Sequence, residues 1–297
     1  MARQRPQGGL TPLPASSRWA AAPALVVLGL LVGAGLGYAL AQSLGGLPLA
    51  GERDWGLSAY RQLFDGAAAG DLWQSALFTL WVSVAATVVA VGVALALLVW
   101  LERPRRAGRA INALVHINLA VPHAVWAVAL LLLISQSGIV ARIATVVGLI
   151  DQPADMPALV RDRFGLGIIL HYATKEAPFL TLVGLALLRS QPREHGLVAD
   201  TFGAHGLRRL RVFILPTIWP GLVVASGFVF AFVFGAFEAP ATLGVSSPRM
   251  LSVLGLDLFN AAGLDARPAA MALGIVMSVM VAAVAWGATR LIVSFTR

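Results

Sequence analysis

Residues 75–101 read SALFTLWVSVAATVVAVGVALALLVWL, a stretch without a single charged side chain or proline. At a rise of 1.5 Å per residue, an α-helix of this length is ~40 Å long, which exceeds the ~30 Å hydrocarbon core of a bilayer. The apolar residues are continuous rather than alternating, and a helix satisfies its backbone hydrogen bonds internally, as lipid requires. The stretch therefore predicts a transmembrane helix in an integral membrane protein.

Apolar runs of similar length recur along the chain and predict an all-α fold with six transmembrane helices. Of all residues, 58% are hydrophobic and 12% are charged, and the mean hydropathy is +0.81. Soluble domains carry about 25% charged residues, so the composition also indicates a membrane protein. The spans are expected at residues 19–41, 75–101, 111–135, 165–188, 217–238 and 268–293.

The arginines are distributed unevenly over the segments between these runs. With the N-terminus inside, 14 arginines fall in inside segments and 7 in outside segments. An excess of basic residues marks the cytoplasmic side, so both termini are expected in the cytoplasm, with residues 1–18 as a disordered tail. Because these arginines are spread over several short segments, the net charge of +8 does not indicate a nucleic-acid surface.

The sequence lacks the motifs for several kinds of chemistry. A nucleotide-binding P-loop ends in lysine followed by serine or threonine, but the single lysine, Lys175, is followed by Glu176. The chain has no cysteine, which excludes disulfides and thiolate metal sites. It also has no HExxH pair and no evident pair of nucleophile and base. We therefore expect no enzyme activity, no metal site and no cofactor on this chain.

Several ionisable residues lie inside the predicted spans, where a charge costs about 2.5–3.5 kcal/mol on insertion scales and usually faces a cavity or a partner. His171 lies four residues before Lys175, so the two share a helix face, whereas Lys175 and Glu176 point about 100° apart. One interpretation is a translocation path lined by His171, Lys175, Glu176 and Glu238. The alternative is that these groups only hold the helices together through hydrogen bonds and ion pairs.

Three other residues in the spans are interpreted as structural. His116 and His123 can be satisfied by backbone carbonyls as neutral imidazoles, and Pro178 is expected to kink its helix. Acids and histidines inside the membrane would also suit a proton-coupled carrier, so an ion-coupled secondary transporter remains an alternative function. A membrane scaffold that transports nothing is a third.

Segment 189–219 is a polar, arginine-rich connection between two apolar runs, and it is longer than a turn requires. A short helical pattern precedes Gly203, which allows a bend, and residues 207–214 restart a helix with arginines largely on one side. Pro216 marks the entry into the next span. Loops of this length usually carry function or are disordered, so we expect a protruding knob that a partner outside the membrane can bind.

This loop resembles the cytoplasmic signature of permease subunits of bacterial binding-protein-dependent ABC importers. The family pattern is Glu-Ala-Ala, three residues, glycine, about nine residues, a hydrophobic residue, any residue, and Leu-Pro. The chain departs from it at Leu197, where the family has its acid, and at Val198. The matching positions are Ala199, Gly203, Phe213, Leu215 and Pro216.

The resemblance extends beyond the loop. Residues 75–87 look like the start of that family's core domain, and the likeness covers residues 72–293. It implies a type I importer fold with a five-helix core and a cytoplasmic coupling helix, preceded by a first helix and outside loop at 19–71 and followed by a short C-terminus at 294–297. Segment 234–240 is similar to the branch that handles polyamines, ferric ions, thiamine, phosphonates or sulfate-type anions, without selecting a solute.

The resemblance implies a permease subunit of an ATP-driven solute importer in the bacterial inner membrane. A second permease subunit, of the same or a different chain, would complete the path, and an external binding protein would deliver the solute. Cytoplasmic ATPase subunits on separate chains would bind ATP and switch the permeases between inward- and outward-facing states. The residues expected to dock the ATPase are Ala199, Asp200, Gly203, Ala204, Arg208, Arg209, Leu215 and Pro216.

Overall fold

The computed structural model describes residues 21–46, 55–65, 69–101, 106–190, 206–263 and 266–295. Within these ranges all regular structure is helical, as the sequence predicts. The elements are α2 (Ala22–Ser43), α3 (Ser58–Asp65), α4 (Ala69–Leu101), α5 (Arg106–Ala120), α6 (His123–Ile134), α7 (Ile139–Val146), η1 (Pro153–Asp155), α8 (Leu166–Arg189), α10 (Gly206–Arg209), η2 (Leu210–Ile214), α11 (Leu215–Gly235), α12 (Glu238–Leu243), α13 (Leu251–Phe259) and α14 (Arg267–Phe295).

Five helical segments in the described part of the chain are long and apolar enough to cross a membrane. Helix α8 has 24 residues but is not one of the five, because His171, Lys175 and Glu176 lower its hydropathy. It nevertheless packs against α4 and α11 in the interior of the bundle. The five segments are Ala22–Ser43, Ala69–Leu101, His123–Val146, Gly206–Gly235 and Arg267–Gly287.

The core of the bundle is the contact between α4 and α8, which is the most extensive between any two described helices. Ala86, Ala90 and Ala94 follow one another at four-residue steps on α4 and are fully buried. Small side chains at such positions allow two helix backbones to approach closely. Gly184 of α8 completes the fit, because a Cβ there would lie 2.6 Å from Cδ1 of Leu98.

A second apolar cluster ties α3, α13 and α14 to the N-terminal part of α4 and the end of α11. Its fully buried members include Leu63, Leu251 and Leu273. The short helix α3 docks onto this cluster through its buried Ala59 and Leu63. Helix α3 is therefore anchored to the bundle by apolar packing.

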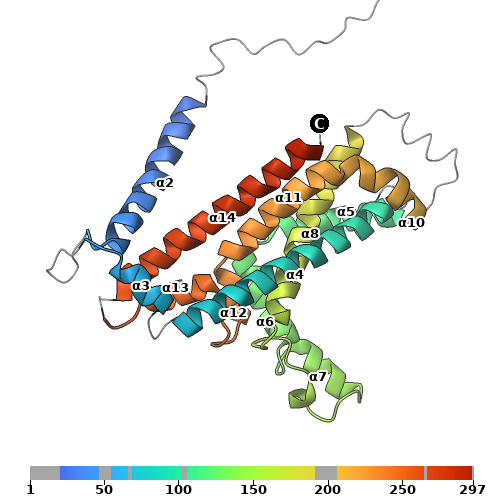
Figure 1. Ribbon diagram of the computed structural model, residues 1–297. Coiled ribbons are helices and arrows are strands. Elements are labelled where there is room, and N and C mark those ends of the chain that lie inside the picture. Colours follow the sequence, from blue (N-terminus) through green and yellow to red (C-terminus); the bar gives the residue numbers. More distant parts are fainter. Residues whose placement is uncertain are drawn as a thin grey trace, which may run out of the picture.

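Helix α2 lies at the edge of the bundle and packs against α14 (Figure 1). Its apolar 18-residue window contains no buried residue. Gly29, Gly33 and Gly37 have no atom within 4 Å of the place where a Cβ would stand. The described part of the chain therefore leaves most of the surface of α2 uncovered.

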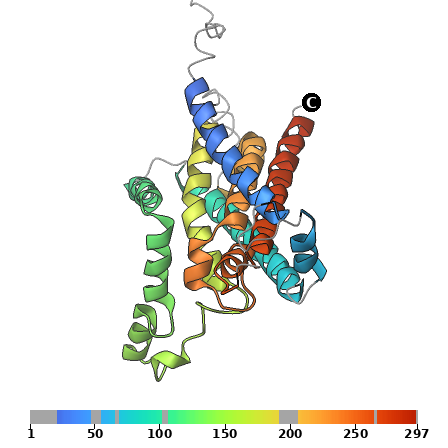
Figure 2. The ribbon, with the colours of Figure 1, turned by 90° about the vertical axis from the view of Figure 1, so that its left-hand side faces the viewer.

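Different helices and helix termini lie at the two ends of the bundle. The start of α2, the end of α14, the end of α8 and the segment α10–η2 lie at one end (Figure 1). Helices α3, α7, α12 and α13 lie at the other end, and Figure 2 shows that α7 extends beyond its neighbours there.

Candidate functional site

The predicted span 111–135 is not one helix, because α5 ends at Ala120 and α6 begins at His123. Pro122 lacks an N–H and disfavours a helical conformation in the residue before it. Pro122 itself is extended, with a ψ of 146°. The prediction of a continuous helix is therefore wrong. Hydropathy measures only how apolar a stretch is, and it contains no information about the backbone hydrogen bond that a proline is unable to donate.

The side chain of Lys175, on α8, lies at this break and binds backbone carbonyls there. Its Nζ donates hydrogen bonds to the carbonyl oxygens of Asn118, at 2.6 Å, and Val121, at 2.7 Å. The end of a helix leaves carbonyls unpaired and carries a partial negative charge. The ammonium therefore satisfies carbonyls freed at the end of α5 and joins that end to α8, in a position where Lys175 is only 3% exposed.

Glu176 points away from Lys175, as the helical offset predicts. Its carboxylate instead faces His123 of α6, with Oε1 3.7 Å from Nε2. This separation is longer than a hydrogen bond, and Glu176 is only 8% exposed. His123, which the sequence analysis sets aside as structural, is therefore the nearest ionic partner of Glu176 in the described structure.

Rings from α8 and α11 pack around His123. Its ring centroid lies 5.1 Å from that of Phe232 and 5.6 Å from that of His171, whose ring is 4.8 Å from Tyr172. His171 and Tyr172 are almost completely buried, yet both ring nitrogens of His171 and the Tyr172 hydroxyl lack a hydrogen-bond partner among the described residues. Buried polar atoms are normally paired, so these atoms mark the place as a candidate site.

We call the group formed by His123, His171, Tyr172, Lys175 and Glu176 the polar cluster. Three of these residues, all on α8, belong to the predicted path: His171, Lys175 and Glu176. Tyr172 and His123 are the members that the path prediction missed. Tyr172 could have been found from the sequence, because it lies between two predicted members on the same helix, but no sequence signal places His123 against Glu176.

Glu238 does not lie in the fifth membrane helix as predicted. Helix α11 ends at Gly235, and Glu238 begins the separate short helix α12 as an exposed residue. It is close enough to His123 and Tyr172 to interact with both electrostatically. Glu238 therefore borders the polar cluster from another element instead of being buried within it.

A second polar contact fastens α6 to α8 beside the polar cluster. Trp126 Nε1 donates to Thr174 Oγ1 at 2.9 Å, and the Thr174 hydroxyl donates in turn to the carbonyl of Leu170 at 2.8 Å. This contact was not predicted, because the two residues are 48 positions apart. It holds the N-terminal part of α6 against α8 just beyond the helix break.

The polar cluster does not resemble a metal centre. Within the described ranges, no three histidine, aspartate or glutamate side chains come close enough together to hold a metal ion. His116 is exposed on α5. The polar cluster offers instead one buried carboxylate, one buried ammonium and several ring faces, with the exposed Glu238 at its border, and such a set suits binding of a polar organic molecule.

Only part of the predicted docking loop can be placed. Ala199, Asp200, Gly203 and Ala204 lie outside the described residues. The other four lie on a continuous helical segment from α10 through η2 into α11, and they are Arg208, Arg209, Leu215 and Pro216.

This helical segment, residues 206–216, presents a mixed surface at its end of the bundle. Ile214 is fully buried in the core, whereas Leu207 and Val212 are 60% and 66% exposed. The Arg209 guanidinium lies 5.4 Å from the centre of the Phe213 ring, close enough for a cation–π contact. The segment therefore combines basic groups with exposed apolar side chains, as a surface for a protein partner would.

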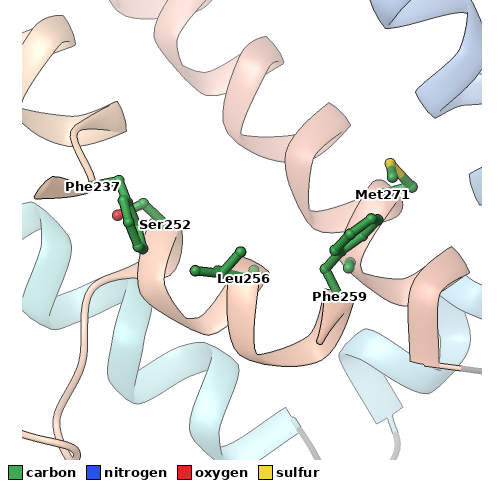
Figure 3. Close-up of a pocket in the computed structure, with 7 residues that line it drawn as sticks. Phe237, Ser252, Leu256, Phe259 and Met271 are labelled. Atoms are coloured by element: carbon green, nitrogen blue, oxygen red, sulfur yellow. The ribbon is translucent and has the colours of Figure 1, made fainter. Parts of the chain in front are cut away.

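Two adjoining apolar hollows lie along α13 and α14. One, of about 330 Å³, is lined by residues that include Phe237, Leu256 and Phe259 (Figure 3). The other, of about 430 Å³, extends toward α11 and shares Ser252 and Ala270 with the first. No residue lining either hollow is charged, so both suit packing against an apolar surface and neither contains the polar cluster.

A third, more polar hollow of about 840 Å³ lies between the end of α6 and η1. Gln136 forms part of its wall and donates through Nε2 to the carbonyl of Met156 at 2.9 Å. Gln152 and Arg161 also line it. It therefore lies at the end of the bundle opposite the α10–η2 segment.

The fold is that of a multi-pass membrane protein. Its buried Lys175 and Glu176 lie beside the break between α5 and α6. Residues 86–296 match the family described as binding-protein-dependent transport system inner membrane component. The match covers more than half of the chain, and the chain belongs to this family. It is accordingly a permease-type component in the inner membrane, as its resemblance in sequence predicts.

Curated relatives of this chain are permeases. It is 30% identical over 212 residues to the thiamine transport system permease protein ThiP of Brucella abortus (strain 2308), covering 69% of this chain and 37% of that protein. It is 27% identical over 167 residues to the inner membrane ABC transporter permease protein YnjC of Escherichia coli (strain K12), covering 56% of this chain and 30% of that protein. The chain thus spans about a third of the length of these relatives.

Solved structures with the same fold come from a bacterial ABC transporter involved in the import of the acidic polysaccharide alginate. One chain has a TM-score of 0.75 at 18% identity and covers 95% of this chain and 96% of that one. Another, from the transporter in complex with an alginate pentasaccharide-bound periplasmic protein, has a TM-score of 0.72 at 18% identity and covers 93% of each chain. The predicted all-helical fold of an importer permease is confirmed.

Proposed function

We propose that this chain is the permease subunit of an ATP-driven solute importer and that the polar cluster lines its translocation path. The observation that carries the proposal is the break between α5 and α6, where Lys175 binds the freed carbonyls and Glu176 is buried beside His123. Irregular backbone at membrane depth is tolerated where protein buries it or where it lines a cavity, and interrupted helices are common at transporter binding sites.

The polar cluster is bordered by groups that remain accessible in the single chain. Phe232 of α11 is 45% exposed, and Glu238 of α12 is exposed as well. A second permease subunit, either another copy or a different chain, would cover this side and complete the path. In this arrangement Glu176 and His171 form the deeper wall, whereas Glu238 and Phe232 meet the solute at the edge.

We propose that the segment around α10 and η2 is the surface on which an ATPase subunit, on a separate chain, docks. Its exposed apolar residues and arginines support docking by packing and charge. The residues Ala199 to Ala204, which match the family signature in part, would form the rest of the contact. We propose that this end, together with both chain termini, faces the cytoplasm, since the excess of arginine lies there.

The opposite end would meet an external binding protein. Helix α7 extends beyond its neighbours at this end (Figure 2), and the polar hollow lined by Gln136, Gln152 and Arg161 opens there. The solved alginate transporter in complex with a periplasmic protein supports a partner of this kind. The present chain would bind no nucleotide and no cofactor, so the energy for transport would enter through the ATPase subunits.

Thiamine is the first solute to test, because the ThiP relatives are named as thiamine permeases. The tagged chain should be purified from its native membranes, and its partners identified by mass spectrometry. We expect a separate ATPase to accompany it, and expect uptake into proteoliposomes to require ATP.

Two other results would contradict the proposal in different ways. Uptake driven by an ion gradient, with no ATPase present, would identify an ion-coupled secondary transporter. A purified complex that docks a cytoplasmic partner but moves no solute would identify a scaffold.

A further inference from the structure

The hollow of about 840 Å³ between the end of α6 and η1 lies at the edge of the bilayer. Helix α6 has 12 residues, so it rises ~18 Å from the helix break at the polar cluster. Helix α8 starts at Leu166, nine residues or ~14 Å before Lys175. The hydrocarbon core extends about 15 Å to either side of its midplane. Because Lys175 lies near the middle of α8, the polar cluster is near mid-depth and the hollow is at the level of the lipid headgroups.

The wall of this hollow has an apolar part and a polar part. Leu131 and Leu132 of α6 form the apolar part, and Leu132 is 61% exposed. Val125 and Val128 are exposed on α6 as well, and with Leu132 they follow the i, i+3, i+7 spacing of one helix face. An exposed apolar face of a membrane-spanning segment suits contact with lipid chains, and this one leads into the hollow. The polar part of the wall consists of Ser135, Gln136, Ser137, Gln152 and Arg161.

Hydrogen bonds fix the backbone around the polar part of the wall. Gln136 Nε2 donates to the carbonyl oxygens of Ala154 and Met156, at 3.3 and 2.9 Å, and so fastens the chain around η1 to the end of α6. The backbone N–H of Arg161 donates to the carbonyl oxygen of Leu243 at 2.8 Å. The two sides of the hollow are therefore held in place before any ligand binds.

Arg161 is the basic residue in this wall, and its backbone is strained. Its φ of 58° lies in the left-handed region, which residues with a side chain seldom adopt. A glycine would adopt it without strain, so the turn by itself gives no reason for an arginine. The neighbouring Asp162 carboxylate accepts the N–H groups of Phe164 and Leu166, both at 2.8 Å. No side-chain hydrogen bond or ion pair of Arg161 is found in the described part of the chain, so its donors are open to a ligand.

We infer that this hollow binds a membrane phospholipid, whose phosphate accepts hydrogen bonds from the Arg161 guanidinium and whose acyl chain packs along Leu131 and Leu132. The planar guanidinium presents several N–H donors in a geometry that suits phosphate oxygens. A carboxylate of a soluble partner would use Arg161 alone, whereas a phospholipid uses both parts of the wall. The site shares no residue with the polar cluster, and the inference goes beyond the proposed transport function.

The test measures phospholipid binding to the full-length chain, purified with its partners in detergent. Native mass spectrometry counts the phospholipids that stay bound, and the rise in melting temperature with added dioleoyl phosphatidylglycerol gives an apparent Kd. We expect Arg161→Ala to raise this Kd about tenfold, because hydrogen bonds to charged groups are worth at least roughly that factor. Arg163→Ala is the matched control, since Arg163 is exposed but does not line the hollow. Its Kd should stay within about twofold of wild type.

A second variant tests the apolar part of the wall. Leu132→Ser removes apolar surface from the proposed acyl-chain contact without touching a charge, and the exposure of Leu132 keeps the substitution out of the core. We expect the Kd for phospholipid to rise severalfold, because the contact is apolar. Leu30→Ser, at a residue 68% exposed on α2, is the control and should leave the Kd unchanged. An unchanged melting temperature without added lipid shows that each variant is folded.

Wild-type phospholipid binding in Arg161→Ala overturns the inference. Equal stabilisation by inorganic phosphate and by phospholipid also overturns it and identifies a site for small anions. If Arg161→Ala instead raises the concentration of external protein needed for half-maximal uptake, with lipid binding unchanged, the arginine belongs to a protein contact. Lipid binding is measured without transport, so its failure leaves the importer function intact, and uptake that needs no ATPase overturns only that function.

Discussion

Lys175 joins two helices of the bundle through its ammonium group. From the sequence, a lone intramembrane lysine is compatible with a role in transport or with a role in holding the bundle together. In the structure, its Nζ binds the carbonyls of Asn118 and Val121, so the structural role is established by geometry. The same hydrogen bonds join the end of α5 to α8 beside the Glu176 carboxylate, which we propose lines the solute path.

Lys175→Met should lower the thermal stability of the purified protein. Methionine keeps the length and apolar stem but removes both hydrogen bonds to the part-buried carbonyls of Asn118 and Val121, at a cost of about 1–3 kcal/mol. Melting in detergent measures the effect. Ser278→Ala is the matched control, because it removes a hydrogen bond from an exposed residue. Equal melting temperatures for Lys175→Met and wild type would show that the break does not depend on the ammonium.

Gly167→Ala should destabilise the N-terminal end of α8. A Cβ at this position would lie 2.6 Å from the backbone carbonyl oxygen of Leu159, and backbone cannot move aside as a side-chain tip can. We expect a loss of about 1–3 kcal/mol, as for overpacked sites, measured by thermal melting. Gly92→Ala should be neutral or slightly stabilising, because nothing lies within 4 Å of its Cβ position and alanine favours helix.

At the scale of elements, two prolines in apolar segments differ in whether they interrupt the helix. Pro122 separates α5 from α6, whereas α8 continues through Pro178 as one helix. Both lack an N–H, so local sequence alone predicts a disturbance at each. At Pro122 a lysine from another helix satisfies freed carbonyls, and this tertiary contact allows the chain to change direction.

Leu207→Asp should weaken docking of the ATPase subunit. Leu207 is 60% exposed on the helical segment that we propose docks the ATPase. A charge buried at the centre of an interface typically lowers the affinity about tenfold or more. The measurement is the amount of ATPase that co-purifies with the tagged chain. Leu149→Asp, at a residue 78% exposed near the opposite end, should leave it unchanged. Equal loss in both variants would mean that the segment has no special role.

At the scale of the whole molecule, the arrangement of the ends determines which partners can reach which surface. The α10–η2 segment shares one end with the start of α2 and the end of α14, and α7 lies at the other (Figure 1). An ATPase and an external binding protein would therefore contact opposite ends of the same bundle. The polar cluster, carried by α6 and α8, would lie on the route between them.

Cysteine labelling tests this orientation directly, because the chain has no cysteine of its own. Cysteine substituted at Leu149 should react with a membrane-impermeant maleimide on intact spheroplasts. Cysteine substituted at Leu207 should react only after the membrane is permeabilised. The reversed pattern would place the α10–η2 segment outside the cell and contradict docking to a cytoplasmic ATPase.

The sequence by itself determined the class of protein and most of the helices. Hydropathy is a sum over neighbouring residues, so it identifies runs such as 75–101 without any knowledge of their partners. The same holds for α8, whose predicted bounds of 165–188 agree closely with Leu166–Arg189. The signature of the loop likewise depends on local spacing, and it pointed to the family that the match over residues 86–296 then confirmed.

Only the tertiary structure decided which charges meet. Lys175 binds carbonyls more than 50 positions away, and Glu176 faces His123 across the α6–α8 contact. Such pairs depend on how helices approach and rotate in the bundle, which the alanines of α4 and Gly184 help to set. Periodicity along one helix carries no information about the neighbour it will face, so the polar cluster and the helix break that organises it appear only once the chain is packed.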